Sequence, residues 1–183
     1  MVASNLVLSA DRPLRTLVLG GARSGKSAHA EQLASVAGSA VRYIATARVD
    51  AADHDFQRRI AAHRARRPST WSVVEDTDLA AALRAVDSPT LVDDIGTWLT
   101  AEIDSAAAWE LPRGTVDTVD LVSAVADYSE RLVLVSPEVG QGVIPATTSG
   151  RLFRDELGTL NQRLASVCDE VVFVVAGLPM RLK

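Results

Sequence analysis

The chain has 183 residues, 48% of them hydrophobic, which is enough to bury one substantial core and too short to favour two independent catalytic domains. A formal net charge of -4 excludes a bulk positive field that would attract nucleic acid or an anionic membrane surface. A single cysteine, Cys168, cannot form an intrachain disulfide, and no secretory leader pattern opens the sequence. No apolar run approaches the ~20 residues of a membrane-spanning helix. We therefore expect a cytoplasmic protein without a transmembrane segment.

The first predicted elements are a strand, a glycine loop and a helix. Residues 1–13 end in Asp-Arg-Pro and show no sustained period, so they are interpreted as a poorly ordered N-terminal extension. A short apolar run at 14–19 contains β-branched residues and predicts a strand, which breaks at Gly20-Gly21. The alanine-rich segment from Gly25 to about residue 37 has the propensity of a helix.

Strands and helices alternate along the rest of the chain. Apolar runs predict further strands at 41–45, 71–75, 90–94, 132–136 and 171–176, and helix-like stretches cover 52–67, 77–86, 95–108, 117–130 and 151–167. The alternation predicts an α/β protein in which residues 14–183 form a single catalytic domain, with a mainly parallel sheet flanked by helices. The Gly-, Pro- and Thr-rich segment 137–150 follows a buried strand, where loops surround the ligand in such sheets.

The glycine loop matches the P-loop pattern G-x-x-x-x-G-K-[ST] and lies between the predicted strand and helix. In such a loop, backbone N–H groups and the positive end of the following helix surround phosphate oxygens. Lys26 is interpreted as the contact to the β- and γ-phosphates and Ser27 as a ligand of Mg²⁺. Lysine stands out here because only Lys26 and Lys183 are lysines among 19 basic residues. The predicted nucleotide-binding residues are Gly20, Gly21, Ala22, Arg23, Ser24, Gly25, Lys26 and Ser27.

The metal needs an acidic second contact, and two carboxylates end the apolar run at 91–94. Asp93 is the first choice for this contact, as in a Walker-B segment. Asp94 precedes the predicted helix at 95 and is suited to cap it. One acid can therefore cap the helix while the other binds Mg²⁺.

Five arginines surround His63 between residues 58 and 67. On a helix, Arg59 and Arg67 lie four residues to either side of His63 and share its face, an array that suits a polyphosphate. A neutral imidazole in such a place can attack phosphorus. On the residues alone, however, a solvated charged face or a packed core histidine is the favoured interpretation.

Several motifs in a fixed order resemble the bifunctional adenosylcobinamide kinase and adenosylcobinamide-phosphate guanylyltransferase family of cobalamin biosynthesis. The resemblance covers nearly everything after residue 14. It rests on GGARSGKS at 20–27, YIAT at 43–46, HRARRP at 63–68, LVD at 91–93, EVGQG at 138–142, GRLFRD at 150–155, Asn161-Gln162 and the ending AGLPMRLK. One departure is Pro137, where relatives usually have asparagine.

The resemblance implies a RecA-like P-loop fold, a homotrimer, GTP and ATP as substrates with Mg²⁺, and adenosylcobinamide and its phosphate as acceptors. It implies two reactions: phosphorylation of the adenosylcobinamide hydroxyl, then transfer of GMP from GTP through a guanylylated histidine. Many relatives have a His-His pair where this chain has Ala62-His63, so the resemblance assigns the nucleophile to His63. The implied nucleotide site also includes Thr46, Arg64, Ala65, Arg66, Arg67, Glu75 and Asp93.

Two other functions remain open on the sequence. One is a simple P-loop kinase of a small molecule, without covalent histidine chemistry. The other is a non-enzymatic, nucleotide-dependent binding module whose arginines contact a partner. The net charge of -4 argues against nucleic acid as that partner, and no residue stands out as a general base for phosphorylation.

Overall fold

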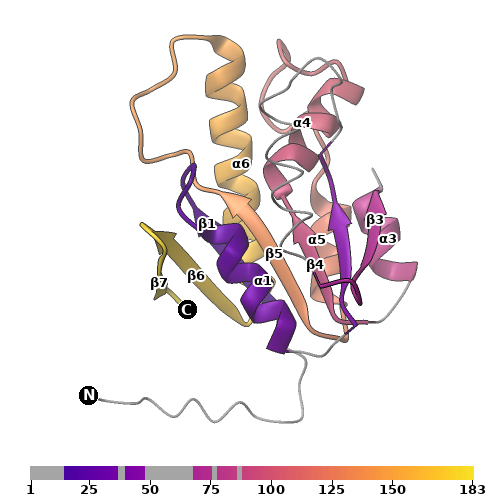
Figure 1. Ribbon diagram of the computed structural model, residues 1–183. Coiled ribbons are helices and arrows are strands. Elements are labelled where there is room, and N and C mark those ends of the chain that lie inside the picture. Colours follow the sequence, from indigo (N-terminus) through magenta and orange to yellow (C-terminus); the bar gives the residue numbers. More distant parts are fainter. Residues whose placement is uncertain (1–14, 37–39, 48–67, 76–77, 86–87) are drawn as a thin grey trace.

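The computed structural model describes residues 15–36, 40–47, 68–75, 78–85 and 88–183 (Figure 1). Its strands form one seven-stranded sheet in the order β3-β2-β4-β5-β1-β6-β7. All neighbouring pairs are parallel except β6 with β7, which is antiparallel. The strands are β1 (Arg15–Gly20), β2 (Arg42–Ala45), β3 (Ser72–Glu75), β4 (Thr90–Asp93), β5 (Leu132–Pro137), β6 (Glu170–Val175) and β7 (Leu178–Arg181).

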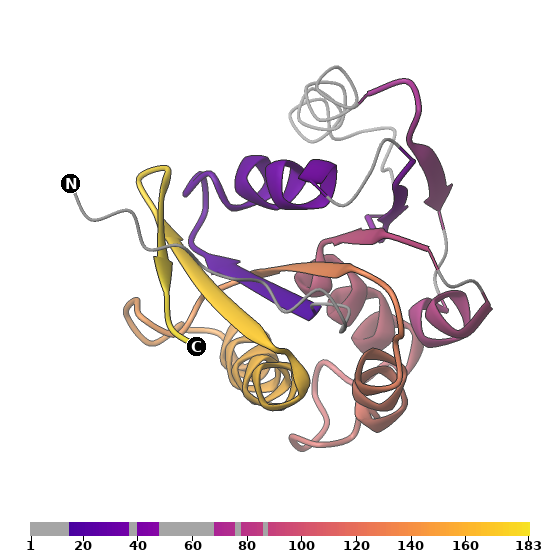
Figure 2. The ribbon, with the colours of Figure 1, turned by 90° about the horizontal axis from the view of Figure 1, so that it is seen from below.

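Helices cover both faces of the sheet, which Figure 2 shows from below. Side chains alternate between the two faces along each strand. Val18 and Val135 therefore pack on the side of α1, whereas Leu17 and Leu134 pack on the side of the other helices; all four are fully buried. The helices are α1 (Lys26–Val36), α3 (Leu79–Ala85), α4 (Ile95–Ser105), α5 (Val119–Ala126) and α6 (Thr148–Val167).

The predicted α/β architecture, one mainly parallel sheet flanked by helices, is confirmed. The strands β2 to β6 begin and end within one residue of their predicted bounds. Helix α4 ends earlier than predicted, because Ala107 takes a positive φ of 49° that a helix cannot continue through. The predicted helix at 52–67 and the extension at 1–13 lie outside the described residues.

Strand β7 was not predicted from the sequence. Its four residues are exposed and include Pro179, which has no N–H to donate to a ladder. Proline is tolerated in edge strands, and among the described strands β7 is the last of the sheet and pairs with β6. Residues 178–181 therefore lack the apolar run from which a buried strand is predicted.

Because strands β1 to β6 run parallel, their carboxyl ends share one edge of the sheet, and the loops that leave them gather there. The loop between β5 and α6 is held at its far end by Arg151, whose guanidinium donates to Pro145 O at 3.0 Å and Ala146 O at 2.8 Å. Thr147 caps α6 by accepting from Gly150 N. In the part of the chain that is described, no helix combines the length and apolarity needed to cross a bilayer.

Pro137, the departure from the family pattern, ends β5 beside Gly20 of β1. The ladder continues past it, since Glu138 N donates to Gly20 O at 3.0 Å. The amide of Asn161, buried on α6, donates to Pro137 O at 3.1 Å and accepts from Ser136 Oγ at 2.6 Å. Proline is therefore accommodated in the strand, and α6 anchors the strand end next to the P-loop.

Cys168 is expected to be inert in the folded protein. Its side chain is 2% exposed, and burial raises the pKa of the thiol to about 12. Only the thiolate reacts, and with that pKa about one thiol in ten thousand is ionised at pH 8. We expect no measurable reaction with dithionitrobenzoate at pH 8 within about an hour, and one thiol per chain in guanidinium. Fast labelling of the native protein contradicts this burial.

Candidate nucleotide-binding site

The P-loop connects the end of β1 to the start of α1. Ser24 is buried and organises the turn: its N–H donates to Gly21 O at 3.3 Å, and its Oγ accepts from Lys26 N at 3.3 Å. Gly25 has a φ of +94°, a conformation that glycine adopts without strain. Because α1 begins at Lys26, the N–H groups of its first turn lie beside the loop, which is the arrangement of an anion site.

The ammonium of Lys26 lies across the loop. Its Nζ donates to Gly21 O at 3.4 Å, a long hydrogen bond to a neutral carbonyl. A phosphate oxygen is a stronger acceptor for an ammonium than a carbonyl is, so this contact can be exchanged when a nucleotide enters.

Ser27 and Asp93, the two predicted metal ligands, lie side by side. Ser27 Oγ is 3.4 Å from Asp93 Oδ1, and the hydroxyl of the buried Tyr43 donates to Asp93 Oδ2 at 2.7 Å. Mg²⁺ prefers hard oxygen ligands and takes one or two of them from the protein, the rest from phosphates and water. The hydroxyl and the carboxylate therefore fit this ion when a triphosphate occupies the P-loop; the metal role itself stays a prediction.

Asp94 is the N-cap of α4, as predicted. Its Oδ1 accepts from Thr97 N at 2.8 Å. Burial, followed by the charge of Asp93, raises the pKa of this carboxyl above its ordinary value. Of the two neighbouring acids, Asp94 therefore caps helix α4, whereas Asp93 contacts Ser27.

Thr46, a predicted nucleotide contact, ties the end of β2 to the start of α4. Its hydroxyl donates to Asp94 O at 2.6 Å and lies 2.6 Å from Thr97 Oγ1, and its side chain is buried. These contacts are all within the protein. They support the geometry around Asp94, and a direct contact of Thr46 with the nucleotide remains a prediction.

Glu75 ends β3 at the same edge of the sheet. The register pairs Ala45 of β2 with Glu75 on one side and with Asp93 on the other. Two strand spacings, about 10 Å, therefore separate the backbones of Glu75 and Asp93.

The predicted nucleophile and its arginine cluster lie outside the described residues: His63, Arg64, Ala65, Arg66 and Arg67.

Sequence reasoning missed two contributors to this site. Tyr43 holds Asp93 through its hydroxyl, and the only signal for this was that a buried tyrosine needs a hydrogen-bond partner. The second is the turn between β6 and β7, whose Gly177 N–H donates to Ser24 O at 2.8 Å. No local pattern marks that contact, because the two residues come from opposite ends of the domain.

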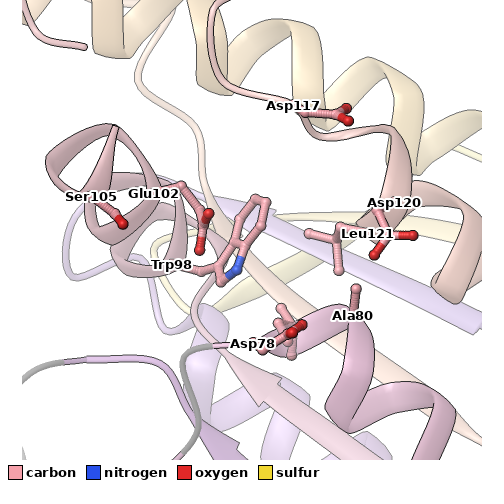
Figure 3. Close-up of a pocket in the computed structure, with 9 residues that line it drawn as sticks. Asp78, Ala80, Trp98, Glu102, Ser105, Asp117, Asp120 and Leu121 are labelled. Atoms are coloured by element: carbon pink, nitrogen blue, oxygen red, sulfur yellow. The ribbon is translucent and has the colours of Figure 1, made fainter. Parts of the chain in front are cut away.

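A separate cavity of about 320 Å³ lies between the starts of α3 and α5 and the helix α4 (Figure 3). Several of its carboxylates already serve the fold: Asp78 accepts from Ala81 N at 2.9 Å, and Asp120 pairs with Arg84 at 2.6 Å. Four acids in one cavity repel a triphosphate, so the P-loop remains the candidate nucleotide site. The lining residues are Asp78, Leu79, Ala80, Trp98, Glu102, Ser105, Asp117, Asp120 and Leu121.

The fold resembles that of a solved ATPase, EscN from the type III secretion system of enteropathogenic E. coli. The TM-score is 0.50 at 13% sequence identity, and the match covers 90% of this chain and 43% of that one. The chain thus spans less than half of the ATPase, and at this identity the similarity concerns the fold alone. It supports the predicted α/β fold with a mainly parallel sheet flanked by helices.

Three curated relatives match almost end to end. The bifunctional adenosylcobalamin biosynthesis protein CobP of Pseudomonas aeruginosa is 44% identical, with 93% of this chain and 98% of that protein covered. The CobU proteins of Salmonella typhimurium and Escherichia coli are 37% and 35% identical, each with 91% of this chain and 98% of the relative covered. The family model described as cobinamide kinase / cobinamide phosphate guanyltransferase matches residues 16–182. The chain therefore belongs to the cobinamide kinase / cobinamide phosphate guanyltransferase family.

Proposed function

We propose that this protein phosphorylates adenosylcobinamide and then transfers GMP from GTP to the product, through a guanylylated His63. The observation that carries the proposal is the P-loop with Ser27 beside Asp93, at 3.4 Å, in a chain of this family. The proposal includes a cytoplasmic location, inferred from the single cysteine, and a homotrimer, inferred from the family resemblance.

In the kinase step, the chain's main contribution is to position and neutralise the triphosphate. The N–H groups of the P-loop and of the first turn of α1 hold phosphate oxygens. Lys26 exchanges Gly21 O for the β- and γ-phosphates and stabilises the charge that develops as the γ-phosphoryl group leaves. Mg²⁺, held by Ser27 and Asp93, would supply further neutralisation of these oxygens.

In the transferase step, a ring nitrogen of His63 attacks the α-phosphorus of GTP. The bond to the β-phosphate oxygen breaks, pyrophosphate leaves with the electron pair, and the imidazole proton passes to solvent. A phosphate oxygen of adenosylcobinamide phosphate then attacks the same phosphorus and forms adenosylcobinamide-GDP; the P–N bond breaks, and the imidazole takes a proton from solvent as it leaves. Arg64, Arg66 and Arg67 stabilise the developing charge. Glu75 accepts hydrogen bonds from the guanine or the ribose, which a carboxylate does well.

Two experimental outcomes separate this proposal from its rivals. A simple kinase phosphorylates adenosylcobinamide, and His63→Ala leaves all its activity intact. A binding module binds nucleotide but turns over neither substrate. The acidic net charge of -4 disfavours the version in which the module binds nucleic acid.

The deciding experiment incubates the protein with Mg²⁺ and GTP labelled at the α-phosphate. We expect acid-labile, base-stable label on the wild type and on His54→Ala, a matched control for which no chemistry is proposed, and no label on His63→Ala. Addition of adenosylcobinamide phosphate is expected to move the label from protein to product. Active wild-type protein that carries no label, or label that persists on His63→Ala, contradicts the covalent step.

A further inference from the structure

The turn between β6 and β7 lies beside the P-loop (Figures 1 and 2). Gly177 N–H donates to Ser24 O at 2.8 Å. A Cβ placed on Gly25 would lie 3.1 Å from Gly177 Cα, so the two glycine backbones are in direct contact. The hairpin therefore packs its turn against the very peptide at which the loop bends toward α1.

The turn has a backbone conformation that directs this N–H outward. Val175 pairs with Leu178, which leaves Ala176 and Gly177 as a two-residue connection. Their φ values of +52° and +79° are the positive values that a type I′ turn requires at both central positions. Gly177 adopts such a value at no steric cost. The turn is thus preset by its backbone, independently of the P-loop.

The contact fixes the orientation of one peptide plane of the phosphate cradle. In a planar trans peptide, the C=O and the following N–H point in opposite directions. Since the C=O of Ser24 points at the hairpin, the N–H of Gly25 points away from it. Within the described part of the chain, nothing accepts a hydrogen bond from Gly25 N–H.

We propose that Gly177 is a positioning residue for nucleotide binding: its N–H holds the Ser24–Gly25 peptide so that Gly25 N–H faces the phosphates. This inference rests on the proposed binding of the nucleotide at the P-loop. Without the contact, the peptide can rotate and present the carbonyl, which repels an anion. With the contact in place, the β6–β7 hairpin stabilises the orientation of the P-loop backbone at the nucleotide site.

The first test compares Gly177→Val with Gly177→Asn. Within the described residues, nothing lies within 4 Å of a Cβ at this position, so the first side-chain atom of either variant has room. The variants differ in tolerance of a positive φ, which asparagine adopts readily and a β-branched residue does not. We expect Gly177→Val to raise the Kd for GTP and for ATP by about tenfold, as for one lost hydrogen bond, and Gly177→Asn by less than about twofold. Equal affinities of the two variants overturn the proposal.

The second test removes only the N–H. Because Cys168 is the one cysteine, a synthetic segment 168–183 can be ligated there to give the full chain, with glycolic acid in place of Gly177. The control chain carries an ester at Leu182, whose N–H donates to Val171 O at 2.8 Å at the other end of the hairpin. We expect similar losses of Tm, but a weaker GTP affinity, by about tenfold, for the Gly177 ester alone.

Two outcomes count against different claims. If the Gly177 ester and the Leu182 ester bind GTP equally well, the hairpin has only a structural role and the positioning proposal fails. If the wild-type chain assembled by the same ligation binds no nucleotide while its Tm matches that of the expressed protein, the proposed function at the P-loop fails instead.

Discussion

Replacement of Lys26 by alanine is expected to lower kcat for adenosylcobinamide phosphorylation by about 10³-fold, as for loss of one preorganised donor to a developing charge. Lys26 is the P-loop cation, and within the described residues its ammonium makes one long hydrogen bond, to the neutral Gly21 O at 3.4 Å, which a phosphate oxygen can replace. Steady-state kinetics with ATP and with GTP measure the effect. The Kd for both nucleotides is expected to rise as well, because the ground-state triphosphate uses the same contact.

Lys183→Ala is the matched control, because Lys183 is the other lysine of the chain. Its Nζ donates to Cys168 O at 2.7 Å, at the end of α6, so we expect kcat within about twofold of the wild type. Lys26→Arg is expected to lower kcat as well, since a planar guanidinium does not replace a compact ammonium in the loop. If Lys26→Ala retains kcat within about threefold, Lys26 does not contact the transferred phosphoryl group.

The parts of the site that the sequence could predict are those encoded within a few neighbouring residues. The P-loop is one contiguous motif between a strand and a helix, and Asp93 and Asp94 directly follow an apolar run. Capping chemistry then separates the two acids, because only Asp94 precedes the first residue of α4. Local physics was sufficient to place the P-loop between β1 and α1 and the cap at Asp94, whereas the metal role of Asp93 stays a prediction.

The parts that could not be predicted depend on which strands become neighbours. Tyr43 reaches Asp93 only because β2 lies beside β4, although β3 and α3 separate them along the chain. Gly177 reaches Ser24 only because β6 lies beside β1. Strand order is set by packing of the whole sheet, and no short pattern reports it.

Asp93→Asn is expected to lower kcat/KM for phosphorylation by about 10²-fold and to raise the Mg²⁺ concentration for half-maximal rate at least about tenfold. The substitution keeps an oxygen for the Tyr43 hydroxyl, so the buried contact at 2.7 Å survives and the fold is spared. What it removes is the negative charge next to Ser27 Oγ, and with it the attraction for a divalent ion. A Mg²⁺ titration at saturating nucleotide measures the shift.

Asp94→Asn separates loss of the metal ligand from loss of a carboxylate in general. Asparagine caps a helix as well as aspartate does, and burial already disfavours the charged form of Asp94, so α4 loses little stability. We expect the Mg²⁺ dependence of Asp94→Asn to match that of the wild type, whatever its kcat. If instead Asp94→Asn shifts the Mg²⁺ titration and Asp93→Asn does not, the metal is held by the capping residue, and the contact between Asp93 and Ser27 only supports the fold.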